Sequence, residues 1–279
     1  MTSLQQTKVK VRRTGQKLTR RIRVGGGHRM RTATRAALRR KPPAHMIHIG
    51  KTGGTALKDT LSPLRTSGRY ELQLHKHRTT LADIPIGEKV FFVIRDPVDR
   101  YVSGFNSRLR EGRPRYERLW TPQEREAFEE FTTPDELALA LASDDGARRV
   151  RAHVAMMSIQ HVQDSYWKWF NQRRYFHRRR DDILLIQWFP DLTATFPRLC
   201  EALGLPGNPQ LPTDPKRSHR TPSNVSTFMS EQAVENVRWW FARDYAFVEL
   251  CARMDCFAGP TWTSALAPVA ERPQTAADA

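Results

Sequence analysis

The segment HIGKTGGTAL, residues 48–57, carries residues that suit the binding of a phosphate-like anion. Gly53 and Gly54 let backbone N–H groups approach an anion, and Lys51 adds a positive charge. A nucleotide-hydrolase loop has a glycine, four residues and then Gly-Lys-Ser/Thr, whereas here the first of these positions is His45. The loop therefore departs from the ATP-binding pattern, and taken alone it also fits an ordinary tight turn between a strand and a helix.

A second segment, VIRDPVDRYVSGF, places a cation and a hydroxyl eight residues apart, at Arg95 and Ser103. The apolar run 90–94 before it is typical of a central parallel strand. Asp96 and Pro97 suit the N-cap and the first position of a helix, and helical spacing puts Ser103 on a polar face. We therefore expect Arg95 at the carboxyl end of a strand, where ligands bind in open α/β sheets.

Hydrophobic periodicity and capping residues predict the elements that position these two segments. Strands are expected at residues 45–49, 90–94 and 181–187. Helices are expected at 55–64, from the cap Asp96 to 110, after Thr121 and Thr133, and at 148–177, 191–203 and 230–251. The cluster of Trp and Arg residues at 166–180 could line an acceptor cleft, although Trp167 and Phe170 at helical spacing also fit core packing and the arginines a solvated face.

The net charge of +17 is concentrated at the N-terminus. Residues 1–41 hold 14 of the 46 Lys and Arg residues and no Asp or Glu, which leaves 32 basic against 29 acidic residues elsewhere. We expect a basic disordered arm at 1–43, a folded domain at 44–257 and a flexible tail at 258–279. An anionic polymer or a membrane surface is the expected partner of the arm.

The three cysteines, Cys200, Cys251 and Cys256, give neither a disulfide framework nor a metal-ligand spacing. We interpret them as core thiols in a reducing compartment. The sequence contains no run of 18 apolar residues and no secretory signal, so we expect no transmembrane segment and a cytoplasmic location.

Together the two segments resemble the sulfotransferases that use 3′-phosphoadenosine 5′-phosphosulfate (PAPS), in particular carbohydrate enzymes of the heparan sulfate 2-O-sulfotransferase kind. The segment 48–57 is similar to their 5′-phosphosulfate loop, usually Ile-Pro-Lys-Thr-Gly-Gly-Thr, with Gly50 in the place of proline. The spacing of Arg95 and Ser103 is similar to that of their 3′-phosphate motif. The resemblance extends loosely over residues 45–255 and implies an α/β, P-loop-like three-layer fold with a central parallel sheet flanked by helices.

The resemblance also implies roles for these residues. Lys51 is expected to offset charge on the leaving phosphate, while Arg95 and Ser103 are expected to hold the 3′-phosphate. The 5′ side of PAPS would be held by backbone and hydroxyl donors of Thr52, Gly53, Gly54 and Thr55. A metal ion is not expected, and the acceptor is expected to be a sugar hydroxyl.

The acceptor hydroxyl needs a base, and LQLHKHRTT offers His75 and His77 between the two motifs. In an extended segment two side chains two residues apart point the same way. The resembling carbohydrate enzymes have His-x-His here with the second histidine as base, which assigns the base to His77 and a supporting role to His75. Other branches of the family use a glutamate, and Glu71 is the competing candidate.

A later segment, KRSHRTPS, could fold over the nucleotide as a Ser- and Thr-containing loop does in similar enzymes. Ser218 and Thr221 are its candidate donor-binding residues, although the segment also fits a solvated basic turn. Two other functions stay open from the sequence: a P-loop kinase using ATP, and an anion-binding module without catalysis. The kinase would need a glycine at position 45 and a carboxylate for Mg²⁺.

Overall fold

The computed structural model describes residues 41–114, 116–207, 209–212 and 226–260. The chain divides into two units, Met1–Pro42 and Pro43–Ala279. All the described strands and helices belong to the second unit. None of these helices is long and apolar enough to cross a membrane.

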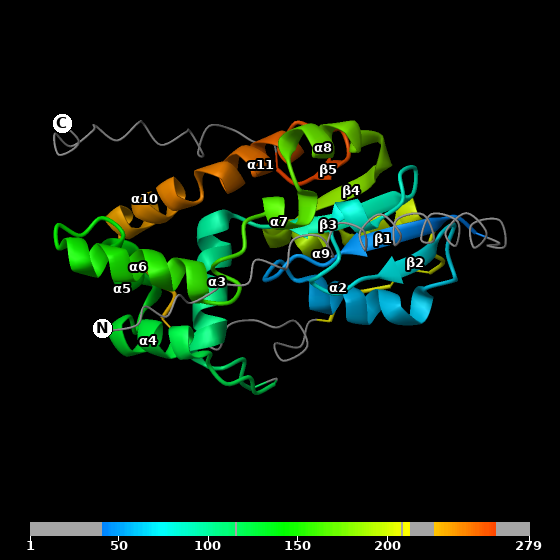
Figure 1. Ribbon diagram of the computed structural model, residues 1–279. Coiled ribbons are helices and arrows are strands. Elements are labelled where there is room, and N and C mark those ends of the chain that lie inside the picture. Colours follow the sequence, from blue (N-terminus) through cyan, green and yellow to red (C-terminus); the bar gives the residue numbers. More distant parts are fainter. Residues whose placement is uncertain (1–40, 115, 208, 213–225, 261–279) are drawn as a thin grey trace, which may run out of the picture. The chain divides into compact units, whose positions relative to one another are not determined.

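A five-stranded, all-parallel sheet forms the centre of the unit (Figure 1), with the strand order β2-β1-β3-β4-β5. Its strands are β1 (Pro43–Ile47), β2 (Glu71–Leu74), β3 (Lys89–Ile94), β4 (Ile183–Trp188) and β5 (Phe257–Ala258). The strands β1, β3 and β4 are buried along almost their whole length, as expected for a parallel sheet covered on both faces.

The described residues form ten α-helices. They are α2 (Gly54–Leu61), α3 (Pro97–Leu109), α4 (Pro122–Glu130), α5 (Pro134–Ala140), α6 (Gly146–Ser158), α7 (Trp167–Phe170), α8 (Arg173–Arg178), α9 (Leu192–Leu203), α10 (Glu231–Trp240) and α11 (Ala242–Ala252). Short 3₁₀ turns occupy Ser62–Leu64, Leu81–Asp83, Arg180–Asp182 and Phe189–Asp191.

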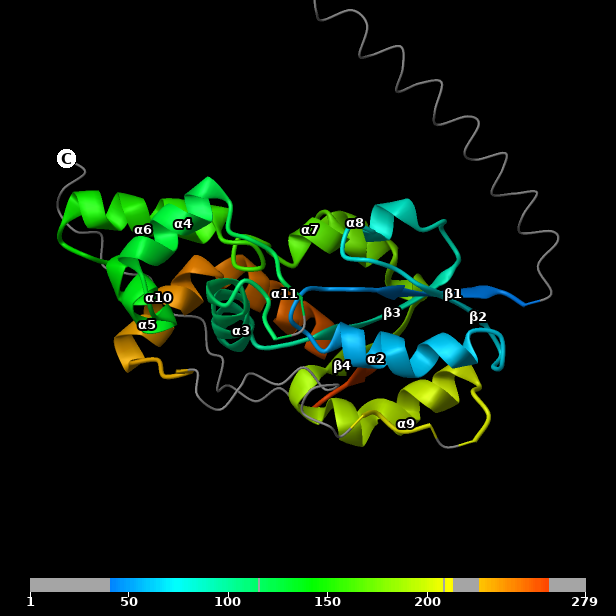
Figure 2. The same ribbon diagram turned by 90° about the horizontal axis from the view of Figure 1, so that it is seen from below.

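Helices cover both faces of the sheet, which gives the predicted three-layer α/β architecture. On one face α2 and α9 pack through Leu57, Leu61 and Phe196. On the other face α7, α8 and α11 pack through aromatic side chains such as Phe170 and Phe247. Figure 2 shows the sheet between α2 and α9 on one side and α7 and α8 on the other. The helices α3, α4, α5, α6 and α10 build a separate all-helical core beside the sheet (Figure 1).

The strand order places the two predicted binding segments next to each other. The chain passes from β1 to β2 on one side and then returns to β3 on the other side of β1. Loops that follow such neighbouring strands diverge at a topological switch point, where open α/β sheets bind ligands. Because β1 and β3 are paired and parallel, as in the register Ile47 with Phe92, the segments after Ile47 and Ile94 emerge at the same edge.

Most helix boundaries agree with the sequence-based prediction. The carboxylate of Asp96 accepts hydrogen bonds from Val98 N and Asp99 N at the start of α3, and capping boxes begin α4 and α5 at Thr121 and Thr133. The chain leaves α9 at Gly204 with a left-handed φ of 64°, as expected for a C-terminal glycine.

Two predicted helices are interrupted. The helix expected over 148–177 is wrong in its middle, because the segment between α6 and α7 contains His161 with a left-handed φ of 72°. The helix expected over 230–251 divides at Phe241 into α10 and α11. The first interruption places the segment between α6 and α7, which contains His161, against Gly50 of the loop after β1.

Candidate active site

The loop between β1 and α2 turns sharply through two residues in the left-handed conformation. Lys51 and Gly53 adopt left-handed φ angles of 68° and 77°. The hydroxyl of Thr52 donates to the carbonyl of Ile49 at 3.1 Å, so this side chain stabilises the turn from within. Among the described residues no side chain caps α2, whose first residue is Gly54, so the N–H groups of its first turn can serve a ligand.

Close packing explains the two glycines at the start of α2. A Cβ atom on Gly53 would lie 2.6 Å from the ring of Phe189, and one on Gly54 would lie 2.4 Å from the ring of His48. Thr55, at the second position of the helix, is half-buried. Glycine at both positions therefore allows the loop to pack against Phe189 and His48. Glycine also suits the left-handed conformation of residue 53.

Arg95 follows β3 directly and reaches across to the loop. Its Nη1 donates to the carbonyl of Lys51 at 3.5 Å, and its guanidinium carbon lies 4.6 Å from the centre of the Phe189 ring. The Nε atom is buried and makes no hydrogen bond to a described residue, although it forms a long ion pair with the half-exposed carboxylate of Asp99 at 3.8 Å. A buried donor without a hydrogen bond is costly unless a ligand supplies an acceptor, so Arg95 suits an anion site.

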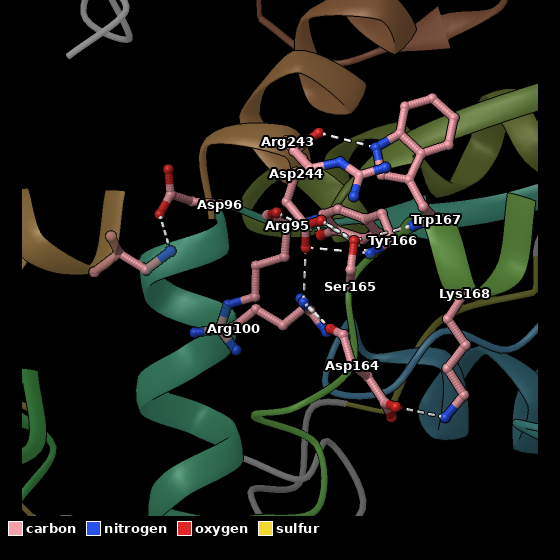
Figure 3. A network of polar contacts seen from close by, with 11 residues as sticks. Arg95, Asp96, Arg100, Asp164, Ser165, Tyr166, Trp167, Lys168, Arg243 and Asp244 are labelled. Carbon is pink, nitrogen blue, oxygen red and sulfur yellow. Dashed lines mark hydrogen bonds and ion pairs between the residues drawn. The ribbon is translucent and has the colours of Figure 1, made fainter. Parts of the chain in front are cut away.

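The backbone of Arg95 is fixed by Tyr166. The Tyr166 hydroxyl donates to the carbonyl of Arg95 at 2.6 Å and accepts from its N–H at 2.9 Å. Figure 3 shows this contact inside a larger polar network. There the buried carboxylate of Asp244 pairs with Arg100 at 2.9 Å and accepts from Tyr166 N at 3.1 Å and from Ser165 Oγ. The network joins α3, α11 and the segment before α7.

Lys51 lies in a strongly basic environment. Burial of its ammonium group, and then the charges of Arg110 and Arg95, lower the pKa of Lys51 from 10.5 to about 8. Arg110, at the end of α3, has a buried Nη1 atom that makes no hydrogen bond to a described residue. Three cations around one loop repel one another, so an anion bound among them relieves that repulsion.

The other predicted donor-binding residues have different outcomes. Ser103 is half-buried on α3, and its position relative to a bound donor stays a prediction. Ser218 and Thr221 lie outside the described residues. No group of three or more His, Cys, Asp or Glu side chains among the described residues has the arrangement of a metal site.

His77 lies beside the loop, beyond the end of β2. Its Nδ1 is 3.0 Å from the carbonyl oxygen of His48, and its ring lies 3.9 Å from the His48 ring. Because a carbonyl only accepts, Nδ1 carries the proton and Nε2 keeps its lone pair. Partial burial lowers the pKa of His77, and this effect is larger than the opposite effect of the hydrogen bond to the His48 carbonyl. His77 is therefore neutral near pH 7, and its Nε2 accepts no hydrogen bond from the part of the chain that the structure describes.

His75 has different partners. Its Nε2 lies 2.8 Å from His45 Nδ1, and His45 Nε2 lies 2.6 Å from a carboxylate oxygen of Glu88. Burial, followed by the neighbouring His45 and Lys58, lowers the pKa of His75 to about 4. His45 thus links His75 to Glu88 through its two ring nitrogens, which fixes the orientation of the His75 ring.

Glu71 lies at the first position of β2, paired in register with Pro43 at the start of β1. Its carboxylate accepts from the Gln73 side chain at 3.0 Å. Since the Lys51 loop follows the opposite, carboxyl end of β1, the structure favours His77 over Glu71 as the group close to that loop.

Sequence reasoning assigned no role to three residues that contact or surround the site: His48, Tyr166 and His161. His48 belongs to the quoted loop motif, and its contact with His77 could have been sought from that neighbourhood. No local signal marks Tyr166 and His161, because both reach the site through tertiary contacts with segments that are far away in the sequence.

The fold and the site together define an α/β protein with a lysine-containing loop after the first strand and a second cation, Arg95, at the adjacent strand end. A family model for the sulfotransferase family matches residues 40–247, and the chain belongs to this family. Sulfuryl transfer to an acceptor is the chemistry that membership supports. A comparison with curated proteins finds no match for the chain.

Proposed function

We propose that this protein transfers a sulfuryl group from PAPS to a hydroxyl group of a carbohydrate. The observation that carries the proposal is the contact between Arg95 and the carbonyl of Lys51, 3.5 Å long. It puts a phosphate-type loop and a second cation side by side at neighbouring strand ends. A donor with one anionic group at its 5′ position and another at its 3′ position matches two such adjacent sites.

The residues of the site fit this donor. The uncapped start of α2 and the ammonium of Lys51 would hold the 5′-phosphosulfate. The buried Nε of Arg95, which lacks a hydrogen bond to any described residue, would bind the 3′-phosphate. We further assign Ser103 to the 3′-phosphate, and Ser218 and Thr221 to the covering of the nucleotide.

In the proposed reaction the acceptor oxygen forms a bond to sulfur as the bond between sulfur and the 5′-phosphate oxygen breaks. His77 takes the acceptor proton at Nε2, because Nδ1 already donates to His48. Negative charge grows on the leaving phosphate, and Lys51 offsets it. Positioning and charge stabilisation supply most of the rate enhancement in such transfers.

His75 is proposed to support the base without touching the acceptor proton. Its hydrogen bond to His45, which continues to Glu88, holds the segment that leads to His77 in place. The choice of a carbohydrate acceptor rests on the resemblance to glycan sulfotransferases.

The test combines a binding measurement with an acceptor screen. We expect calorimetry to give clearly tighter binding of adenosine 3′,5′-diphosphate than of ATP with Mg²⁺, and labelled PAPS to transfer its label to sugar acceptors in preference to phenols and lipids. Preference for ATP would indicate a kinase instead. Binding of the diphosphate without transfer to any acceptor would indicate an anion-binding module.

A further inference from the structure

Residues 160–166, in the segment between α6 and α7, are held at both ends by buried ion pairs that α3 makes with other helices. At its first end, Gln160 N donates to Glu124 at 3.0 Å, and Glu124 pairs with Arg108 at 2.7 Å. Both side chains of this pair are 1% exposed. We name residues 160–166 the strap.

The second end of the strap is held in the same way. Tyr166 N donates to Asp244, and Asp244 pairs with Arg100 at 2.9 Å. The carbonyl of Asp164 also accepts from Arg100. Both ion pairs are almost fully buried, so the two carboxylates that accept hydrogen bonds from the strap are themselves held in place. The strap is therefore fixed on each side of His161.

His161 lies inside the strap with a left-handed φ of 72°, which is uncommon for a residue other than glycine. Its ring faces Gly50 of the loop, and its backbone and Cβ face Gly104 of α3. The His77 ring centre is 6.0 Å away. Such a conformation persists only when the surrounding structure imposes it, and it is found preferentially at functional sites.

His161 packs closely against Gly50 of the loop. Gly50 has no left-handed φ, so its backbone does not require glycine. A Cβ atom there would instead lie 3.1 Å from His161 Nδ1, with the next ring atom at 3.8 Å. A side chain at residue 50 would therefore have to displace the imidazole by a few tenths of an ångström, in the loop position where the resembling enzymes have proline.

We propose that His161 is a positioning residue for the Lys51 loop, bracing it from outside in place of the proline ring. This inference rests on the proposed function, since its purpose is to hold Lys51 against the leaving group. Burial, followed by the charges of Lys51 and His77, lowers the pKa of His161 to about 3. The ring is therefore neutral at working pH, and it excludes water from Lys51 without adding to the repulsion from Arg110 and Arg95.

The test is a double-mutant cycle on Gly50→Ala and His161→Ala, with kcat/KM for sulfuryl transfer as the readout. Each single change should lower kcat/KM by roughly ten- to a hundred-fold, because a small displacement of the loop misplaces Lys51. The double variant should be no slower than His161→Ala alone, since without the imidazole the new methyl group meets no ring. Losses that multiply in the double variant would overturn the proposal.

A second readout separates positioning from a general effect on stability. Loss of the imidazole ring should let water reach Lys51 and so raise the pKa of Lys51 above about 8. In His161→Ala the decrease of kcat/KM at alkaline pH should therefore occur at a higher pH than in the wild type. An unshifted alkaline limb in a folded His161→Ala protein would count against the proposal. His177→Ala, which removes an exposed imidazole on α8, is the matched control and should change neither readout.

The outcomes also distinguish this inference from the proposed function. A wild-type protein that neither binds adenosine 3′,5′-diphosphate nor transfers sulfuryl groups would contradict the function itself. An active wild-type protein with an unimpaired His161→Ala variant would contradict only the role of His161.

Discussion

Arg95 and Lys51, 44 residues apart in the sequence, are joined by a hydrogen bond from the Arg95 guanidinium to the Lys51 carbonyl. The contact links the end of β3 to the loop after β1, the two places where a parallel sheet with this strand order binds ligands. A change at either residue is therefore expected to affect both parts of the donor site.

Arg95→Ala should weaken the binding of adenosine 3′,5′-diphosphate by about 2 kcal/mol or more, because a charge-assisted hydrogen bond to phosphate is lost. Titration calorimetry on the folded variant measures this directly. Arg253→Ala, which removes an exposed guanidinium on the surface, is the control and should leave the affinity unchanged. Equal affinities of wild type and Arg95→Ala would refute the assignment to the 3′-phosphate.

Lys51→Ala should lower kcat by roughly 10²-fold or more at saturating donor, because the leaving charge is largest in the transition state. Binding of the product nucleotide should suffer less than turnover. The comparison variant is Lys89→Ala, which removes an ammonium group at the opposite end of β3. A near-normal kcat in Lys51→Ala would contradict the role of Lys51.

His77→Ala should lose activity by about 10² to 10⁴-fold while it keeps its nucleotide affinity, as expected for the loss of a general base. His75→Ala should cost less, because His75 only supports the site. The same assay on Glu71→Gln is the control. An active His77→Ala enzyme beside an inactive, folded Glu71→Gln enzyme would move the assignment to the carboxylate.

The pH profile of kcat/KM should be bell-shaped. His77 must be neutral to accept a proton and its pKa is lowered, so activity is lost only as the pH falls through a value below 6.5. Lys51 must be protonated, so activity is lost as the pH rises through about 8. Lys51→Arg, if active, should lack the alkaline limb because arginine stays charged. A wild-type profile that is flat between pH 7 and 10 would exclude this role for Lys51.

Tyr166→Phe should lower the free energy of unfolding by about 1–3 kcal/mol, because the buried backbone groups of Arg95 lose their partner. It should also weaken nucleotide binding, because the backbone of Arg95 is no longer fixed. Tyr101→Phe is a matched control: this buried hydroxyl on α3 donates to the Pro134 carbonyl, 2.7 Å away. Urea unfolding should show a loss in both variants, whereas calorimetry should show weaker binding only for Tyr166→Phe.

Several parts of this protein depend on local chemistry and can be predicted from the sequence. The glycines and lysine of the loop, the apolar run before Arg95 and the caps at Asp96, Thr121 and Thr133 each carry their signal within a few residues. The structure confirms those caps, the strand before Arg95 and the parallel α/β fold. These features follow from backbone conformation and hydrophobic periodicity, which a short window of sequence is enough to reveal.

The completion of the site depends instead on tertiary contacts. His75 and His77 are two residues apart, yet one bonds to the His45 ring and the other to the His48 carbonyl. The sequence between α6 and α7 has helical character, but two buried ion pairs and the space left by Gly50 and Gly104 hold His161 in a left-handed conformation instead. The partners that impose this conformation lie tens of residues away, so their energy enters only when the chain has folded.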